Sequence, residues 1–199
     1  MIDISGNIDL PPYYFFYDFY KKAKSLGQNP INAISISSYN KENEEVESRF
    51  VNLKYIIGEK WTFFSNYESM KAKSFTHHNQ IAALIYWEKL DLQIRIKAKI
   101  EKSPAEFSDM HFNKRALEKN ALAISSRQSL KIKSYEEVIA NYENILNDKD
   151  ALRKRPSYWG GYTFTPYYFE FWFGHESRLN KRDSYQIKNG ECQHSILQP

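Results

Sequence analysis

The chain has 199 residues, with 28 Lys and Arg against 24 Asp and Glu, which gives a net charge of +4. The basic residues are spread along the chain, whereas a nucleic-acid-binding protein gathers them in one stripe or module, so a nucleic-acid partner is not expected. The one cysteine, Cys192, excludes an intramolecular disulfide and a four-cysteine zinc site.

No stretch of the sequence approaches the roughly 20 consecutive apolar residues that a membrane-spanning helix needs. The first 12 residues contain two Asp and no basic cluster, which is not the pattern of a targeting signal. Aromatic residues make up 16% of the chain, enough for a well-supplied core. We therefore expect one cytoplasmic domain over residues 1–199, with no membrane partner.

The N-terminal half predicts a helix followed by strands. Pro11 and Pro12 suit the first turn of a helix that ends at Gly27. Residues 1–29 form an N-terminal arm that contains this helix. The runs predicted as strands are residues 32–39, 48–56, 61–66 and 80–87. A hairpin turn at Gly58 joins the second and third of these strands, and a short helix precedes the fourth.

The clearest strand covers residues 90–100. From Leu92 to Ile100 every second residue is apolar, and the residues between them are Gln, Arg or Lys. An alternation with a period of two residues places one face of a strand in the core and the other face in solvent. This segment therefore predicts a strand that covers one side of the core.

Two patterns typical of capping boxes predict helices in the second half of the chain. A serine is followed three residues later by a glutamate in Ser103–Glu106 and in Ser134–Glu137. Residues 158–174 then predict a pair of strands, and residues 183–199 predict a final hairpin or edge strand. About seven strands, most of them before the helices, favour an antiparallel sheet or small barrel with attached helices over a doubly wound parallel sheet.

Basic residues follow strand ends at several points, most clearly in EFWFGHESRLNKR, residues 170–182. There an aromatic run ends at Gly174 and is followed by Arg178, Lys181 and Arg182. A flat, phosphorylated cofactor needs this combination, because Arg, Lys and helix N-terminal amides bind phosphate and aromatic walls hold a ring. Solvated charges on exposed strand ends are the alternative interpretation of each fragment taken alone.

Seven segments, taken together and in this order, resemble those of the pyridoxine/pyridoxamine 5'-phosphate oxidases, FMN-dependent enzymes with a split-barrel fold. The segments are RFVNLK (49–54), FFSNYESMK (63–71), LIYWEKLDLQIRI (84–96), SSRQS (125–129), YWGGY (158–162), EFWFGHESRLNKR (170–182) and the C-terminal ILQP. The resemblance covers roughly residues 30–199. It implies a mainly β, α+β fold: an FMN-binding split β-barrel with peripheral helices that acts as a homodimer. Residues 170–199 would take part in dimerisation and cofactor binding.

The resemblance assigns cofactor contacts to positions along most of the chain. These are Arg49, Phe50, Val51, Leu53, Lys54, Phe64, Ser65, Lys71, Gln93, Gln128, Ser129, Trp172 and Arg182. Arg49 and Lys71 would bind the FMN phosphate, and Gln93 would reach the edge of the flavin ring. Four of these residues would come from the other subunit: Gln128, Ser129, Trp172 and Arg182.

The same resemblance assigns the substrate to Lys54, His111, Arg115, Lys119, Arg178 and Asn180. Arg115 would hold the substrate phosphate, while Lys54 and Arg178 would be the catalytic residues. The implied reaction is oxidation of pyridoxamine or pyridoxine 5'-phosphate to pyridoxal 5'-phosphate, with O2 as acceptor and hydrogen peroxide as product. No metal is implied.

Several positions depart from the family pattern. Met70 replaces an Arg of the phosphate site, with Lys73 as a candidate substitute, and Asn180 replaces the His of an Arg-x-His motif. His111 replaces a Tyr and Lys119 replaces a Ser, and these two could also belong to a solvated helix face. The departures keep two alternatives open. One is a flavin oxidase of the same fold that acts on another ring substrate, of the phenazine type; the other is a non-catalytic paralogue that binds FMN or pyridoxal phosphate.

Overall fold

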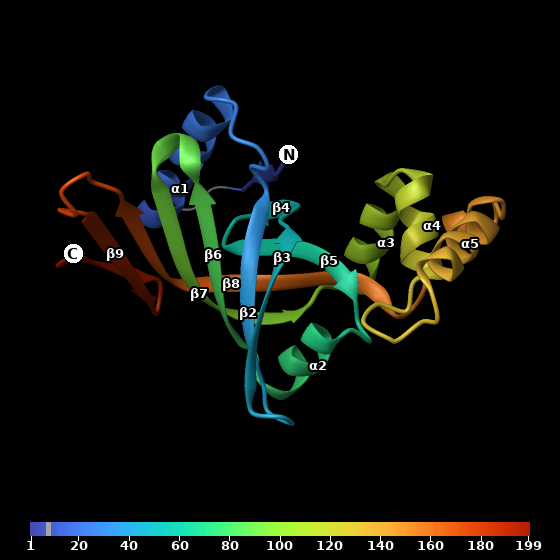
Figure 1. Ribbon diagram of the computed structural model, residues 1–199. Coiled ribbons are helices and arrows are strands. Elements are labelled where there is room, and N and C mark those ends of the chain that lie inside the picture. Colours follow the sequence, from blue (N-terminus) through green and yellow to red (C-terminus); the bar gives the residue numbers. More distant parts are fainter. Residues whose placement is uncertain (7–8) are drawn as a thin grey trace.

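The computed structural model describes residues 1–6 and 9–199, and these residues form ten strands and five α-helices (Figure 1). The strands are β1 (Asp3–Ser5), β2 (Ala33–Asn40), β3 (Glu45–Asn52), β4 (Tyr55–Ile57), β5 (Lys60–Asn66), β6 (Gln80–Trp87), β7 (Leu92–Lys102), β8 (Trp159–Phe173), β9 (Lys181–Lys188) and β10 (Glu191–Leu197). The helices are α1 (Pro11–Ser25), α2 (Met70–His77), α3 (Ala105–Lys114), α4 (Leu117–Ser125) and α5 (Tyr135–Leu146). None of these helices is long and apolar enough to cross a membrane.

The strands form one sheet in the order β1-β4-β5-β8-β7-β6-β2-β3, and β9 and β10 extend it from β8. Every pairing is antiparallel except that of β1 with β4. The long strand β8 pairs with β5 through its first half and with β9 through its second half. Figure 1 shows the consequence: α3, α4 and α5 gather beyond one end of β8, while β9 and the C-terminus lie at the other end.

Aromatic side chains of α1 fill the core on one face of the sheet. Tyr13, Phe16 and Tyr20 follow the spacing of one helix face, and all three are buried. The ring of Phe16 lies 4.4 Å from that of Trp61 and 5.5 Å from that of Trp87, measured between centroids. Burying one such ring contributes about 1.5–3 kcal/mol, so these contacts hold α1 on the sheet.

The alternation predicted for residues 90–100 is confirmed. The apolar residues at every second position of β7, from Leu92 to Ile100, are buried, whereas Arg95, Lys97 and Lys99 are exposed. The N-cap at Ser134 is confirmed too, because its Oγ accepts a hydrogen bond from the backbone N–H of Glu137 at 3.3 Å. The last hairpin is present as β9 and β10.

Three predictions about the elements were wrong. Residues 158–174 form the single strand β8 rather than a strand pair, because the backbone near Pro166 makes a register shift and not a turn. Residues 48–56 are divided between β3 and β4. Ser103 does not cap a helix: Pro104 is the N-cap of α3, and the hydroxyl of Ser103 bonds that of Thr163 at 2.7 Å.

The sequence left open that His111 and Lys119 share one solvated helix face, but the structure interrupts that helix. α3 ends at Lys114, Arg115 is extended with φ −76° and ψ 153°, and α4 begins at Leu117. His111 and Lys119 therefore belong to different helices, with Arg115 between them. The second half of the chain thus contains three helices where the capping boxes predicted two.

Candidate active site

A pocket of about 1030 Å3 lies where β3, β5, the start of α2 and the junction of α3 with α4 meet. This volume is at the upper end of the range typical of cofactor and small-molecule sites. Twelve residues that the sequence assigns to cofactor or substrate line it: Arg49, Phe50, Val51, Lys54, Phe64, Ser65, Lys71, His111, Arg115, Lys119, Gln128 and Ser129. The fold thus brings together residues that are up to 80 positions apart in the chain.

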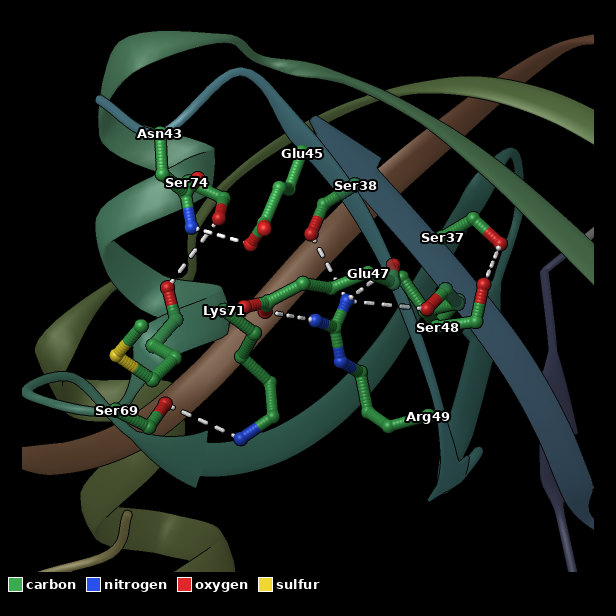
Figure 2. A network of polar contacts seen from close by, with 12 residues as sticks. Ser37, Ser38, Asn43, Glu45, Glu47, Ser48, Arg49, Ser69, Lys71 and Ser74 are labelled. Atoms are coloured by element: carbon green, nitrogen blue, oxygen red, sulfur yellow. Dashed lines mark hydrogen bonds and ion pairs between the residues drawn. The ribbon is translucent and has the colours of Figure 1, made fainter. Parts of the chain in front are cut away.

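Arg49 and Lys71 form the polar network at one end of this pocket (Figure 2). The guanidinium of Arg49 donates to Ser38 Oγ at 2.8 Å and to the Glu47 carboxylate at 2.6 Å. Lys71, from the first turn of α2, donates to Ser65 Oγ at 3.0 Å and to Ser69 Oγ at 3.1 Å. An ammonium carries three donors, so Lys71 retains one hydrogen for a further acceptor.

The charges at this end are two cations and one carboxylate. Lys71 is only 7% exposed, and its burial, together with the positive charge of Arg49, lowers its pKa to about 8. Glu47 acts in the opposite direction on Lys71. Burial also lowers the pKa of Arg49, and Glu47 opposes that effect. Arg49, Lys71 and Glu47 together therefore carry one net positive charge, which is suited to a phosphate group.

A second group of cations lies near the α3–α4 junction: Lys54, Arg115 and Lys119. Burial, then the charges of Lys119 and Arg115, lower the pKa of Lys54, so Lys54 lies within electrostatic reach of both. Among residues 1–6 and 9–199, no carboxylate lies within ion-pair distance of any of the three. A group of neighbouring cations with no carboxylate partner at a pocket favours the binding of an anion.

Parallel aromatic rings form one wall of the pocket. The ring of Phe64 stacks on His111 at 3.7 Å and on Trp159 at 5.4 Å, with interplanar angles of 13° and 16°. The guanidinium of Arg115 lies 4.4 Å from the centre of a Trp159 ring. Burial, followed by the charges of Arg115 and Lys54 and, more weakly, Lys114, lowers the pKa of His111 to about 4. The imidazole is therefore neutral at pH 7.

Five other assigned residues lie at or beyond the far end of β8: Gln93, Trp172, Arg178, Asn180 and Arg182. In the sheet register Gln93 pairs with Trp172, and Trp172 pairs with Arg182. Arg182 donates to Glu170 Oε1 through Nε at 2.9 Å, and Arg95 donates to the other carboxylate oxygen at 2.9 Å. Glu170 is almost fully buried, so this carboxylate fixes the position of Arg182.

Arg178 lies in the turn between β8 and β9 and has a left-handed backbone conformation. Its φ is +59°, a conformation that an L residue adopts at some energetic cost. Three hydrogen bonds hold the turn. Arg178 N–H donates to the carbonyl of His175 at 2.8 Å, Ser177 N–H donates to His175 Nδ1 at 3.1 Å, and His175 N–H donates to Asn180 Oδ1 at 3.1 Å. Asn180, expected to contact the substrate, here holds the turn that carries Arg178.

The sequence also matches known proteins. Residues 159–199 match a family model described as Pyridoxine 5'-phosphate oxidase C-terminal dimerisation region. The chain is 32% identical over 181 residues to the pyridoxine/pyridoxamine 5'-phosphate oxidase 1 of Hydrogenovibrio crunogenus, which covers 91% of this chain and 83% of that protein. It is 36% identical over 170 residues to the corresponding oxidase of Cytophaga hutchinsonii, with coverage of 84% and 78%. The chain belongs to the pyridoxine/pyridoxamine 5'-phosphate oxidase family.

Solved structures agree on the fold. PhzG from Burkholderia lata 383, crystallised in complex with tetrahydrophenazine-1-carboxylic acid, superposes with a TM-score of 0.86 at 21% identity and covers 98% of this chain and 100% of that one. A pyridoxamine 5'-phosphate oxidase-related, FMN binding protein from Nostoc punctiforme gives 0.78 at 11% identity. The split-barrel fold and the oxidoreductase class expected from the sequence are confirmed, and membership of the oxidase family implies a flavin cofactor.

The structure places several residues differently from what the family resemblance implies. Gln128 and Ser129 line the pocket of their own chain, because the segment after α4 folds back over β5 and Gln128 Oε1 accepts from Ser65 Oγ at 3.2 Å. Leu53 is fully buried in the core and does not line the pocket. Lys73 is exposed and does not line it either, so it does not replace the cation lost at position 70.

Four residues of these sites were missed by the sequence reasoning. Glu47 lies two residues before Arg49 on β3, and strand alternation could have placed both side chains on one face. Trp159 and Glu170 lie inside segments that carry the oxidase resemblance, but no role was assigned to them. No sequence feature indicated a role for Tyr55, because its partner His111 is 56 residues away in the sequence.

Proposed function

We propose that the protein oxidises pyridoxamine 5'-phosphate and pyridoxine 5'-phosphate to pyridoxal 5'-phosphate, with FMN as cofactor and O2 as acceptor. The observation that carries this proposal is the presence of two separate cation groups in one pocket. After burial, the charge of Arg49 lowers the pKa of Lys71, whereas the charges of Lys119 and Arg115 lower the pKa of Lys54. Two phosphorylated molecules, a cofactor and a substrate, need two such groups.

The residues of the pocket fit FMN. The Arg49–Lys71 pair, with Ser65 and the free third hydrogen of Lys71, would hold its phosphate, and the aromatic wall would border its ring. The chemistry that FMN supplies when bound is two-electron oxidation of the substrate, with O2 as the acceptor and hydrogen peroxide as the product. Met70 contributes no charge, so we expect weaker FMN binding than with a third cation at the phosphate.

The substrate phosphate would bind the second group of cations. Arg115 is half-buried, held over Trp159 and hydrogen-bonded through Nη1 to Asn120 Oδ1 at 3.4 Å, so its guanidinium is oriented before the substrate arrives. Lys119 adds a charge where the family has Ser, and Lys54 lies within electrostatic reach of both. These side chains would bind and orient the substrate, which places its reacting carbon against the cofactor.

We also infer that a second copy of the chain completes the site. Trp159 lines the pocket, and Trp172 lies 13 residues farther along the same strand. At about 3.3 Å per residue these side chains are about 43 Å apart along β8. Gln93, Trp172 and Arg182 can therefore meet a cofactor in the pocket only in a dimer, where Arg178 of the partner would cover the substrate and help exclude water.

A second candidate is oxidation of another anionic ring substrate, of the phenazine type. It is favoured by the fold match to PhzG, which binds tetrahydrophenazine-1-carboxylic acid, and by the changed residues His111 and Lys119 at the substrate end. A ring carboxylate would bind the same cations as a phosphate. A non-catalytic protein that binds FMN or pyridoxal phosphate is the third outcome to be tested.

The test is an aerobic assay of the FMN-loaded protein with pyridoxamine 5'-phosphate, in which pyridoxal 5'-phosphate and hydrogen peroxide are followed together. Equal amounts of both products, over many turnovers, support the proposal. Bound FMN without product, but with turnover of tetrahydrophenazine-1-carboxylic acid, would favour the second candidate. Bound FMN with neither reaction would favour the non-catalytic protein.

A further inference from the structure

His111 is packed inside the substrate end of the pocket, and its imidazole has one hydrogen-bond partner among residues 1–6 and 9–199. Its ring lies against Phe64, and its Nδ1 is 2.9 Å from the hydroxyl of Tyr55 on β4. The Tyr55 ring also meets the His111 ring edge-on, at 5.3 Å between centroids. Two directions of contact, stacking and a hydrogen bond, therefore fix the orientation of the imidazole.

The hydrogen bond joins the hydroxyl of Tyr55 to Nδ1 of His111, and which of the two atoms donates depends on the tautomer of the imidazole. Burial and, more weakly, Asp3 raise the pKa of Tyr55, so its hydroxyl stays protonated and is able to donate. A neutral imidazole that accepts at Nδ1 carries its proton on Nε2. Among the described residues no partner is found for Nε2, and it is not one of the buried polar atoms sealed from solvent. Its N–H is therefore free to face the pocket that His111 lines.

We propose that Tyr55 is a positioning residue that fixes His111 as the Nε2–H tautomer, so that His111 donates a neutral hydrogen bond to the anionic group of the substrate. The inference rests on the proposed function, because it takes that anion to be the one held by Arg115 and Lys119. Burial and the surrounding cations keep the imidazole neutral, so His111 contributes direction rather than another charge. The opposite tautomer would aim a lone pair at the anion and weaken its binding.

The first test reads the tautomer without any turnover. Long-range 1H–15N correlation spectra of the FMN-loaded protein, labelled at histidine and assigned with His111→Gln, report which imidazole nitrogen is protonated. We expect a protonated Nε2 and an unprotonated Nδ1 in the wild type, and a mixture of both tautomers in Tyr55→Phe. Inorganic phosphate, added as the probe, should shift the Nε2 signal. A wild-type Nδ1–H tautomer, or spectra that Tyr55→Phe leaves unchanged, would overturn the proposal.

The second test separates positioning from folding. One neutral hydrogen bond is worth about 0.5–1.5 kcal/mol, so Tyr55→Phe should raise KM for the phosphorylated substrate about 2- to 12-fold. FMN content and kcat should stay near the wild-type values. The control is Tyr14→Phe, which removes an exposed hydroxyl bonded to Asp9. In a His111→Gln background the Tyr55→Phe change should have no further effect on KM, and an additive effect would contradict the proposal.

A failure of the proposed function is distinguishable from a failure of this inference. If the protein does not oxidise pyridoxamine 5'-phosphate, the tautomer of His111 and its response to phosphate can still be measured. If it does oxidise that substrate but His111 is the Nδ1–H tautomer, only the role of Tyr55 is lost.

Discussion

Replacing Lys71 with Met tests both the electrostatics and the function of the pocket. Burial and Arg49 lower the pKa of this ammonium from 10.5 to about 8. The folded protein therefore holds the charge at pH 7 at a cost of about 3 kcal/mol relative to the unfolded chain. This cost is fully present below pH 8 and is relieved as the pH rises from 8 to 10.5, where the unfolded chain binds a proton that the folded protein does not.

The cofactor-free Lys71→Met variant should consequently be more stable than the wild type at pH 7. The lost hydrogen bonds to Ser65 and Ser69 offset part of the gain, which leaves an expected increase of about 1–2 kcal/mol in the free energy of unfolding. FMN binding should change in the opposite direction. A charge-assisted hydrogen bond contributes about 1.5–3 kcal/mol, so the dissociation constant for FMN should rise about 10- to 150-fold.

Urea unfolding of the cofactor-free proteins and quenching of FMN fluorescence measure the two effects. Lys73→Met is the matched control, since Lys73 is exposed on the same helix and does not line the pocket. It should alter neither quantity by more than about 0.5 kcal/mol. If Lys71→Met weakens FMN binding no more than the control does, Lys71 does not bind the cofactor phosphate. If it destabilises the cofactor-free protein, the argument from burial is wrong.

Three further predictions concern the substrate end, the dimer and pH. Arg115→Ala should raise KM for a phosphorylated substrate about 10- to 150-fold and leave FMN content unchanged; an unchanged KM in steady-state assays would remove Arg115 from the phosphate site. Lys71→Met and Arg182→Ala chains should each bind FMN weakly alone, but about a quarter of the FMN sites should be regained when the two chains are unfolded and refolded together. Random pairing makes half the dimers mixed, and each mixed dimer holds one intact site. No recovery in an FMN titration would argue against a shared site. The pKa of His111 is lowered from 6.5 to about 4 in the folded protein, so His111 binds a proton in the unfolded chain first as the pH falls. The free energy of unfolding should therefore decrease by about 2 kcal/mol between pH 7 and pH 5. His111→Phe should flatten that slope in denaturant titrations, and an unchanged slope would contradict the assignment.

Local patterns in the sequence predicted most of the elements. The alternation in β7 and the prolines at the start of α1 act within a few residues, so they can be read without knowledge of the fold. The errors arose where distant contacts decide the structure. β8 remains one strand because β7 pairs with residues 162–173 of it, on both sides of Pro166, and a register shift at Lys97 absorbs the irregularity there.

The candidate site was predictable where the family motifs are continuous and not where it depends on packing. Arg49 and Lys71 lie in quoted segments, and both line the pocket. The contact between Tyr55 and His111 depends on how α3 packs over β4, and the break in the helix at Arg115 leaves no clear sequence signal. Tertiary contacts of this kind cannot be read from a single sequence.

The measurement that tests the central claim most directly is anaerobic mixing of the FMN-loaded protein with one equivalent of pyridoxamine 5'-phosphate. Without O2, oxidation of the substrate must bleach the flavin absorbance. We predict that the band bleaches with the formation of one pyridoxal 5'-phosphate per FMN and returns when air is admitted. A band that keeps its full absorbance, in a protein shown by titration to bind the substrate, would contradict the claim that this pocket oxidises it.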